Sequence, residues 1–236
     1  MSARELRYWA VRRFPLECGA VLKDVRQAFY LDGELNEARD NLVVIFHALT
    51  GSADAVGDWW SQVVGPGRAV DTDRYAVLAP NLLGSCYGTT ARVAAGRPEP
   101  KVTTRDMARL AGLPVREVGA RSVALVAGGS LGGMVALEWL AQNPGLARAA
   151  AVFAAPAAQT AAALGWNHVQ REAVALDGER GLSLARQVAM LTYRTGGEME
   201  RRFGLRRRSD GRAEVQAYLD HHGEKLVRRF DTASYT

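Results

Sequence analysis

Ser130 is the residue whose type and surroundings point most directly to chemistry. It lies in Gly128-Gly129-Ser130-Leu131-Gly132, which fits the G-x-S-x-G pattern of a nucleophilic serine. Small flanking residues suit a sharp strand-to-helix turn, where larger side chains would collide with the adjoining strand or helix. Such a turn exposes the hydroxyl and places the Leu131 N–H at a helix N-terminus, where it can stabilise an oxyanion. The simpler alternative is a glycine-rich turn whose serine caps the helix.

A second donor to the same oxyanion is expected from the loop after an earlier strand. The segment His47-Ala48-Leu49-Thr50-Gly51 follows an apolar run and fits that place, with the Leu49 N–H as the candidate donor. His47 could be read as a catalytic base. Its position at a strand end favours a structural hydrogen-bonding role, and we adopt that interpretation.

Four short apolar runs predict the buried strands that would position these residues. Their continuous apolarity indicates burial on both faces, as in a parallel sheet. The runs are Leu42–Phe46, Tyr75–Ala79, Ser122–Ala127 and Ala149–Ala154. Two earlier segments, Arg7–Phe14 and Val25–Tyr30, predict an antiparallel lead-in. A helix is expected directly after Ser130, and Asn143-Pro144-Gly145 would end it.

The character of the sequence changes at Gln159. Periodic helical segments follow one another from there, with no convincing strand between them. They are Asn167–Leu176, Leu182–Tyr193 and Val215–Phe230. We therefore expect an α/β core over residues 1–158, with helices on both faces of its sheet, and a helical lid over residues 159–236.

Composition is that of an ordinary globular domain, with 48% hydrophobic and 23% charged residues in a chain of 236. No run of eighteen apolar residues and no secretory signal pattern is present, so we expect a soluble, cytoplasmic protein without a membrane partner. The net charge of +5 is concentrated in residues 201–212. That run is interpreted as a solvated surface, with nucleic-acid binding as the alternative.

Cys18 and Cys86 are expected to be buried. No metal-ligand or phosphate-loop spacing is present, so no cofactor is expected.

Several separated motifs resemble one family, the homoserine O-acetyltransferases of the α/β-hydrolase superfamily. The resemblance covers about Phe14 to Tyr235. Its motifs in the first half are His47-Ala48-Leu49-Thr50-Gly51, Asp58-Trp59-Trp60, the segment 65–75, the segment 81–90 and Gly128-Gly129-Ser130-Leu131-Gly132-Gly133-Met134. Those in the second half are Gly165-Trp166-Asn167, Leu191-Thr192-Tyr193-Arg194, Gly223-Glu224-Lys225-Leu226 and Arg229-Phe230-Asp231.

The resemblance implies a ping-pong transfer of an acetyl group from acetyl-CoA to the hydroxyl of L-homoserine, an early step of methionine biosynthesis. Ser130 would carry the acyl group as an ester, and a homodimer would form through the lid helices. By similarity, Arg194 would hold the carboxylate of the amino acid, a task that suits a bidentate guanidinium. The alternative for Arg194 is a cap at the C-terminus of the preceding helix. Trp59, Trp60 and Tyr87 could line the site or simply pack.

The sequence departs from the family pattern after the lid motifs. Alpha/beta-hydrolases place their triad in the order Ser, Asp or Glu, His, with the last two on loops after later strands. The histidines after Ser130 are His168, His221 and His222, all in lid-like helical segments, and Asp231 lies in a lid motif. The catalytic Asp and His are therefore not found in this chain. We expect a chain that lacks the C-terminal strands and has impaired turnover.

Three alternatives remain open from the sequence. The first is O-succinyl transfer to homoserine or serine on the same scaffold. The second is a hydrolase in which water accepts the acyl group, although the lid motifs argue against it. The third is an inactive chain that binds CoA or a partner subunit, because a serine without a base is a poor nucleophile.

Overall fold

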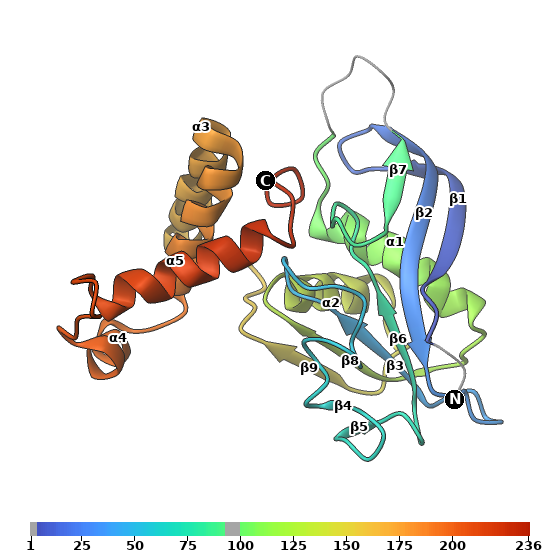
Figure 1. Ribbon diagram of the computed structural model, residues 1–236. Helices are drawn as coiled ribbons and strands as arrows, with labels where there is room; N and C mark the ends of the chain where they lie inside the picture. Colours follow the sequence, from blue (N-terminus) through green and yellow to red (C-terminus); the bar gives the residue numbers. More distant parts are fainter. Residues whose placement is uncertain (1–3, 93–99) are drawn as a thin grey trace. The chain divides into compact units, whose positions relative to one another are not determined.

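The computed structural model describes residues 4–92 and 100–236. The chain forms two compact units, Met1–Ala157 (unit 1) and Ala158–Thr236 (unit 2), which are described separately below (Figure 1). The division falls one residue before the boundary expected from the sequence.

Unit 1 is built on a sheet whose strands run in the order β1-β2-β6-β3-β8-β9, with β7 pairing on β2. These strands are β1 (Arg7–Pro15), β2 (Val21–Asp32), β3 (Leu42–Phe46), β6 (Ala76–Pro80), β7 (Thr90–Arg92), β8 (Val123–Gly129) and β9 (Ala150–Phe153). β3, β6, β8 and β9 pair in parallel, while β1 and β2 pair antiparallel. All four predicted runs form strands of a mostly parallel sheet, and the antiparallel lead-in is confirmed, but the burial predicted for the fourth run is wrong because β9 has no buried residue.

The two faces of this sheet are covered differently. Leu42, Val44 and Phe46 pack with two helices, α1 (Thr104–Glu117) and α2 (Leu131–Gln142). Val43 and Ile45 face the other way and pack under the segment 53–75, which contains the short strands β4 (Val64–Gly65) and β5 (Val70–Asp71). In the described part of unit 1 a loop segment therefore covers this second face. This differs from the expected helices on both faces.

The strand β9 lies at the edge of the sheet, and its residues are exposed or half-buried, whereas every residue of β3 and β6 is buried. Cys18 is exposed and Cys86 half-buried, so the expectation of two buried cysteines is wrong. No helix in the described ranges is long and apolar enough to cross a membrane.

Unit 2 contains the helices α3 (Ala161–Thr192), α4 (Gly196–Phe203) and α5 (Glu214–Val227). The first two predicted helical segments are joined in α3, whose backbone breaks at Asp177 and Gly178, where Gly178 has a φ of 38°. α3 and α5 pack closely, since a Cβ added at Gly223 would lie 2.2 Å from the Ser183 hydroxyl.

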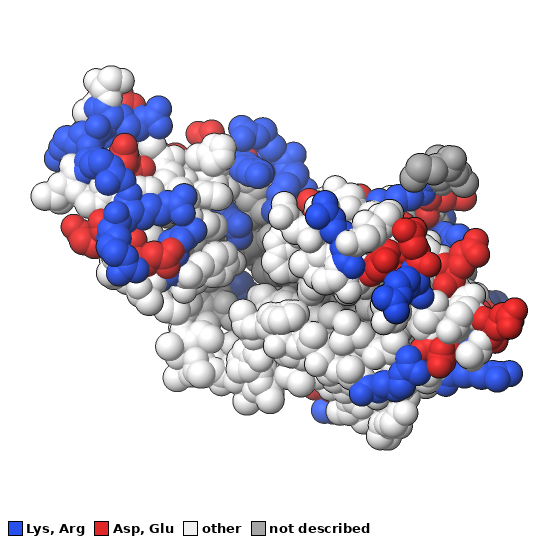
Figure 2. Space-filling model, turned by 90° about the horizontal axis from the view of Figure 1, so that it is seen from below, with Lys and Arg blue, Asp and Glu red and all other residues white. Residues whose placement is uncertain are grey.

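In the basic run of residues 201–212, Arg206 pairs with Glu214, and Arg212 pairs with Asp210 and Asp220. Figure 2 shows blue side chains, with red ones among them, crowded at the end of unit 2 that holds α4.

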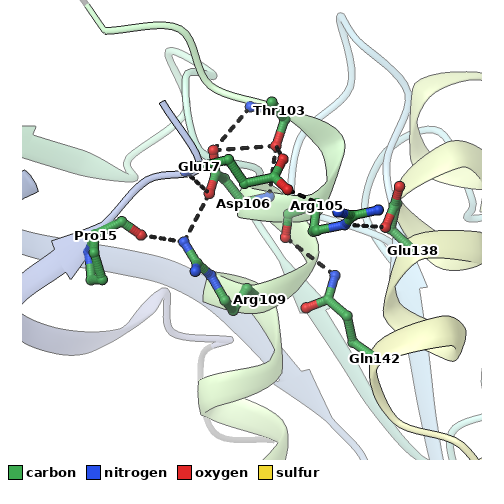
Figure 3. Close-up of polar contacts among 8 residues, drawn as sticks. All are labelled: Pro15, Glu17, Thr103, Arg105, Asp106, Arg109, Glu138 and Gln142. Atoms are coloured by element: carbon green, nitrogen blue, oxygen red, sulfur yellow. Dashed lines mark hydrogen bonds and ion pairs between the residues drawn. The ribbon is translucent and has the colours of Figure 1, made fainter. Parts of the chain in front are cut away.

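A buried carboxylate anchors α1 in unit 1 (Figure 3). Asp106 is fully buried and accepts hydrogen bonds from the Glu17 N–H at 3.1 Å and the Arg109 guanidinium at 2.8 Å. It also forms a capping box with Thr103 at the start of the helix. Arg109 in turn donates to the Pro15 carbonyl, so one carboxylate joins the helix to the end of β1 and the turn after it.

A buried histidine holds the carboxyl ends of two parallel strands together. His47 follows β3 and is 3% exposed, and its Nε2 accepts the Leu82 N–H at 2.9 Å just beyond β6. Its Nδ1 lies 2.8 Å from the Ala48 carbonyl oxygen and therefore carries the proton. Burial lowers the pKa of His47 to about 4, against the opposing effect of the hydrogen bond to Ala48. The structural role predicted for His47 is confirmed.

We predict that Asp106→Ala lowers the free energy of unfolding by about 3 kcal/mol, because it leaves several donors without an acceptor and Arg109 without a counter-ion. The control is Arg105→Ala, which removes only exposed ion pairs with Glu17 and Glu138 and should change the free energy of unfolding far less. Urea unfolding of both variants measures the difference. Equal losses in the two variants would contradict the anchoring role.

We predict that acid destabilises the fold through His47. In the unfolded chain its pKa is near 6.5, so between about pH 6.5 and pH 4 the unfolded state binds a proton that the folded state excludes. The contribution of His47 is complete above pH 6.5 and falls by about 3 kcal/mol as the pH drops to 4. His47→Gln removes the titrating group, so the stability difference between wild type and variant should shrink with falling pH. A difference independent of pH would refute this assignment.

Candidate active site

Ser130 occupies the turn between β8 and α2 and has an unusual backbone conformation. Its φ is 56° and its ψ is −126°, a region that residues with a side chain rarely adopt. The Ser130 N–H donates to the Phe153 carbonyl at 3.0 Å, and its own carbonyl accepts from Gly133 and Met134. The side chain is exposed and makes no hydrogen bond that caps α2. The strand–turn–helix expected around Ser130 is present, and the alternative of a helix-capping serine is wrong.

The glycines around Ser130 are required by close backbone contacts. A Cβ at Gly128 would lie 2.3 Å from the Gly132 carbonyl oxygen, and one at Gly132 would lie 2.1 Å from the Phe46 carbonyl oxygen. A Cβ at Gly133 would lie 2.5 Å from the Cβ of Ala155. The start of α2 therefore rests directly on the ends of β3 and β8, which only glycine permits.

The same contacts bring the loop after β3 beside the start of α2. A Cβ at Gly132 would also lie 2.6 Å from the His47 carbonyl oxygen. Leu49 is two residues further along, in a turn closed by a 2.9 Å hydrogen bond from the Gly51 N–H to the Ala48 carbonyl. Leu131 is the first residue of α2. Both residues proposed as backbone donors thus belong to segments that meet at this edge of the sheet.

Three aromatic side chains form a cluster, one of which lies beside the serine turn. A Cβ at Gly129 would lie 3.3 Å from the Cη2 atom of Trp59, and Trp59 is 59% exposed. Trp60 meets Trp59 edge-on with ring centroids 5.4 Å apart, and it lies 6.4 Å from the ring of Phe153. The sequence left Trp59 and Trp60 open between lining the site and packing. Trp60 packs against the sheet, whereas Trp59 is exposed beside Gly129.

Arg194 and the remaining histidines lie in unit 2. The Arg194 guanidinium pairs with the Glu198 carboxylate, and Tyr218 and Glu198 beside it raise its pKa, so it stays charged. His168 lies in α3 within 4.0 Å of Glu172, and His221 and His222 lie in α5. Burial is the main cause that lowers the pKa of His222. The three histidines lie on helices, as predicted.

The arrangement in unit 1 suits nucleophilic attack by a hydroxyl. An exposed serine stands at the N-terminus of a helix, where backbone N–H groups and the helix dipole favour a developing negative charge. His47 is the only histidine in residues 1–157, and both of its ring nitrogens are engaged in hydrogen bonds. No group of three or more potential metal ligands is found in residues 4–92 and 100–236.

Comparison with known proteins agrees with this geometry. Residues 41–231 match the family described as alpha/beta hydrolase fold. The chain is 41% identical to homoserine O-acetyltransferase of Thermobifida fusca (strain YX), over 94% of this chain and 68% of that protein. It is 40% identical to homoserine O-acetyltransferase of Trichormus variabilis, with the same two shares. The chain thus spans about two thirds of the length of these relatives.

Solved structures also resemble this chain, both in a homoserine O-acetyltransferase and in the fold of an esterase. Homoserine O-acetyltransferase from Staphylococcus aureus superposes with a TM-score of 0.83 at 29% identity, over 98% of this chain and 69% of that chain. Esterase E22 superposes with a TM-score of 0.83 at 20% identity, over 98% of this chain and 75% of that chain, a likeness of fold alone. The chain therefore belongs to the homoserine O-acetyltransferase family of α/β-hydrolase-fold enzymes.

Proposed function

We propose that Ser130 is the nucleophile of an acyl transfer from acetyl-CoA to the hydroxyl of L-homoserine. The observation that carries the proposal is the exposed Ser130 side chain, held in a strained turn with no capping hydrogen bond. The relatives named homoserine O-acetyltransferase support the choice of donor and acceptor.

Two balanced steps describe the transfer. The Ser130 oxygen attacks the thioester carbonyl while a base takes its proton, the C–S bond breaks, and CoA leaves as the protonated thiol. The homoserine hydroxyl then attacks the Ser130 ester, and the serine recovers a proton as the product leaves. The N–H groups of Leu49 and Leu131 would hold the oxyanion in both steps.

The backbone strain at Ser130 favours a functional role over a structural one. A residue with a side chain in this region of φ and ψ costs about 1–3 kcal/mol, and such strain persists only where the surroundings over-determine it. Here the closely packed Gly128 and Gly132 and the hydrogen bond to Phe153 impose the turn. Glycine would adopt this conformation more easily, so a serine in its place indicates a use for the hydroxyl.

The base that would activate Ser130 is proposed to come from outside these 236 residues. In unit 1 the one histidine is committed to the hydrogen bonds of the strand ends. The others lie on the helices of unit 2, and Asp231 accepts the Ser234 N–H. Removal of a triad member typically costs several orders of magnitude in rate, so turnover by this chain would be impaired.

Unit 2 is proposed to act as the lid and to bind the acceptor. Arg194 is charged and would bind the homoserine carboxylate in competition with its present partner, Glu198. A homodimer, a cytoplasmic location and a place in methionine biosynthesis are part of the same proposal.

Mass spectrometry of the intact protein tests the nucleophile. We predict that acetyl-CoA leaves one acetyl group on wild type and none on Ser130→Ala, and that homoserine discharges it. Added imidazole, a diffusible base, should accelerate acetylation of the wild type only. No adduct with or without imidazole would favour the inactive alternative, and acetylation that imidazole leaves unchanged would place the base within this chain.

Stability measurements test the strain separately from the chemistry. We predict that Ser130→Gly is more stable than Ser130→Ala by about 1 kcal/mol, because glycine relieves the positive φ despite its larger entropy in the unfolded chain. Both variants should fail to accept an acetyl group. Urea unfolding compares the two, and a Ser130→Gly variant less stable than Ser130→Ala would contradict a strained turn.

A further inference from the structure

An exposed tryptophan lies against the residue that precedes the nucleophile. The Cη2 and Cζ3 atoms at the tip of the Trp59 ring are 3.3 and 3.8 Å from the position of a Gly129 Cβ. This places the six-membered part of the indole beside the Gly129–Ser130 backbone. Large aromatic side chains gain most from burial, yet Trp59 is 59% exposed.

Neighbouring aromatic rings make Trp59 part of a wall. Trp60 supports it edge-on and is itself near the ring of Phe153. Phe153 is 54% exposed, and its carbonyl accepts the Ser130 N–H, so both exposed rings belong to residues in direct contact with the Gly129–Ser130 turn. Apolar carbon therefore flanks the turn on the sides of β9 and of the loop that carries Trp59.

The two exposed rings of this wall carry no charge themselves. Figure 2 shows an expanse without Lys, Arg, Asp or Glu on the underside of unit 1, whereas Asp58 before Trp59 and Arg68 and Arg74 of the segment 64–75 are exposed. A carboxylate brought against the rings of Trp59 and Phe153 loses hydration without gaining a partner, whereas a methyl group gains from the contact.

We propose that Trp59, with Phe153, forms an apolar acyl-group wall that makes Ser130 accept a short uncharged acyl group and reject one that ends in a carboxylate. The inference rests on the proposed function. The wall would select an acetyl donor over a succinyl donor. Trp59 acts here as a specificity residue, because it would contact the acyl group and take no part in bond making.

Initial rates of Ser130 acylation by acetyl-CoA and succinyl-CoA test the wall, since the two donors share the CoA portion. Intact-mass measurement in the presence of imidazole should show wild type favouring acetyl by about tenfold or more. Trp59→Phe should keep this preference, and Trp59→Ser should lose most of it. Trp59→Arg should favour succinyl, because a guanidinium pairs with the terminal carboxylate.

Tyr8→Ala is the matched control, because Tyr8 is an exposed aromatic residue on β1 and should leave the preference unchanged. Circular dichroism and size-exclusion chromatography check that the variants keep the fold and assembly of the wild type. Two outcomes would contradict the role of Trp59 in selecting the acyl group while leaving Ser130 as the nucleophile. They are a wild type without a preference for acetyl, and a preference for acetyl that survives in Trp59→Ser and Trp59→Arg. Absence of any Ser130 adduct with either donor would overturn the proposed function and the wall with it.

Discussion

The close approach of backbone to backbone at Gly132 is the constraint on which the site depends. A methyl group there would lie 2.1 Å from the Phe46 carbonyl oxygen, well inside van der Waals contact. Because α2 can begin so near the ends of β3 and β8, the chain must reverse within one residue. Ser130 is that residue, and its positive φ follows from the turn.

The same constraint organises the loops at the carboxyl edge of the sheet. The loop after β3 touches the start of α2 through the carbonyls of Phe46 and His47, and the His47 ring ties it to the N–H of Leu82 after β6. A buried neutral imidazole can accept at one nitrogen and donate at the other, which a carboxylate could not do. Three strand ends are thereby held together around an exposed hydroxyl, which suits a site that must be preorganised.

This arrangement separates support from chemistry. The buried polar groups, such as Asp106 and His47, have their hydrogen bonds satisfied within unit 1 and serve the fold. The Ser130 side chain and the rings of Trp59 and Phe153 are exposed, so they contribute little to the stability of the fold. The rings of Trp59 and Phe153 are therefore open to contact with an acyl group on Ser130, as proposed above.

The sequence alone determined the strands, the serine turn and the helical second half, because continuous apolar runs, small residues around Ser130 and helical periodicity are local signals. It did not reveal α1, whose Pro114 and charged residues obscure the pattern, or that the loop 53–75 would cover one face of the sheet. The exposure of Cys18 and the place of Trp59 beside Gly129 were decided only in the tertiary structure. Local patterns specify which residues can form a turn or a strand, whereas contacts between residues seventy positions apart arise only when the sheet assembles.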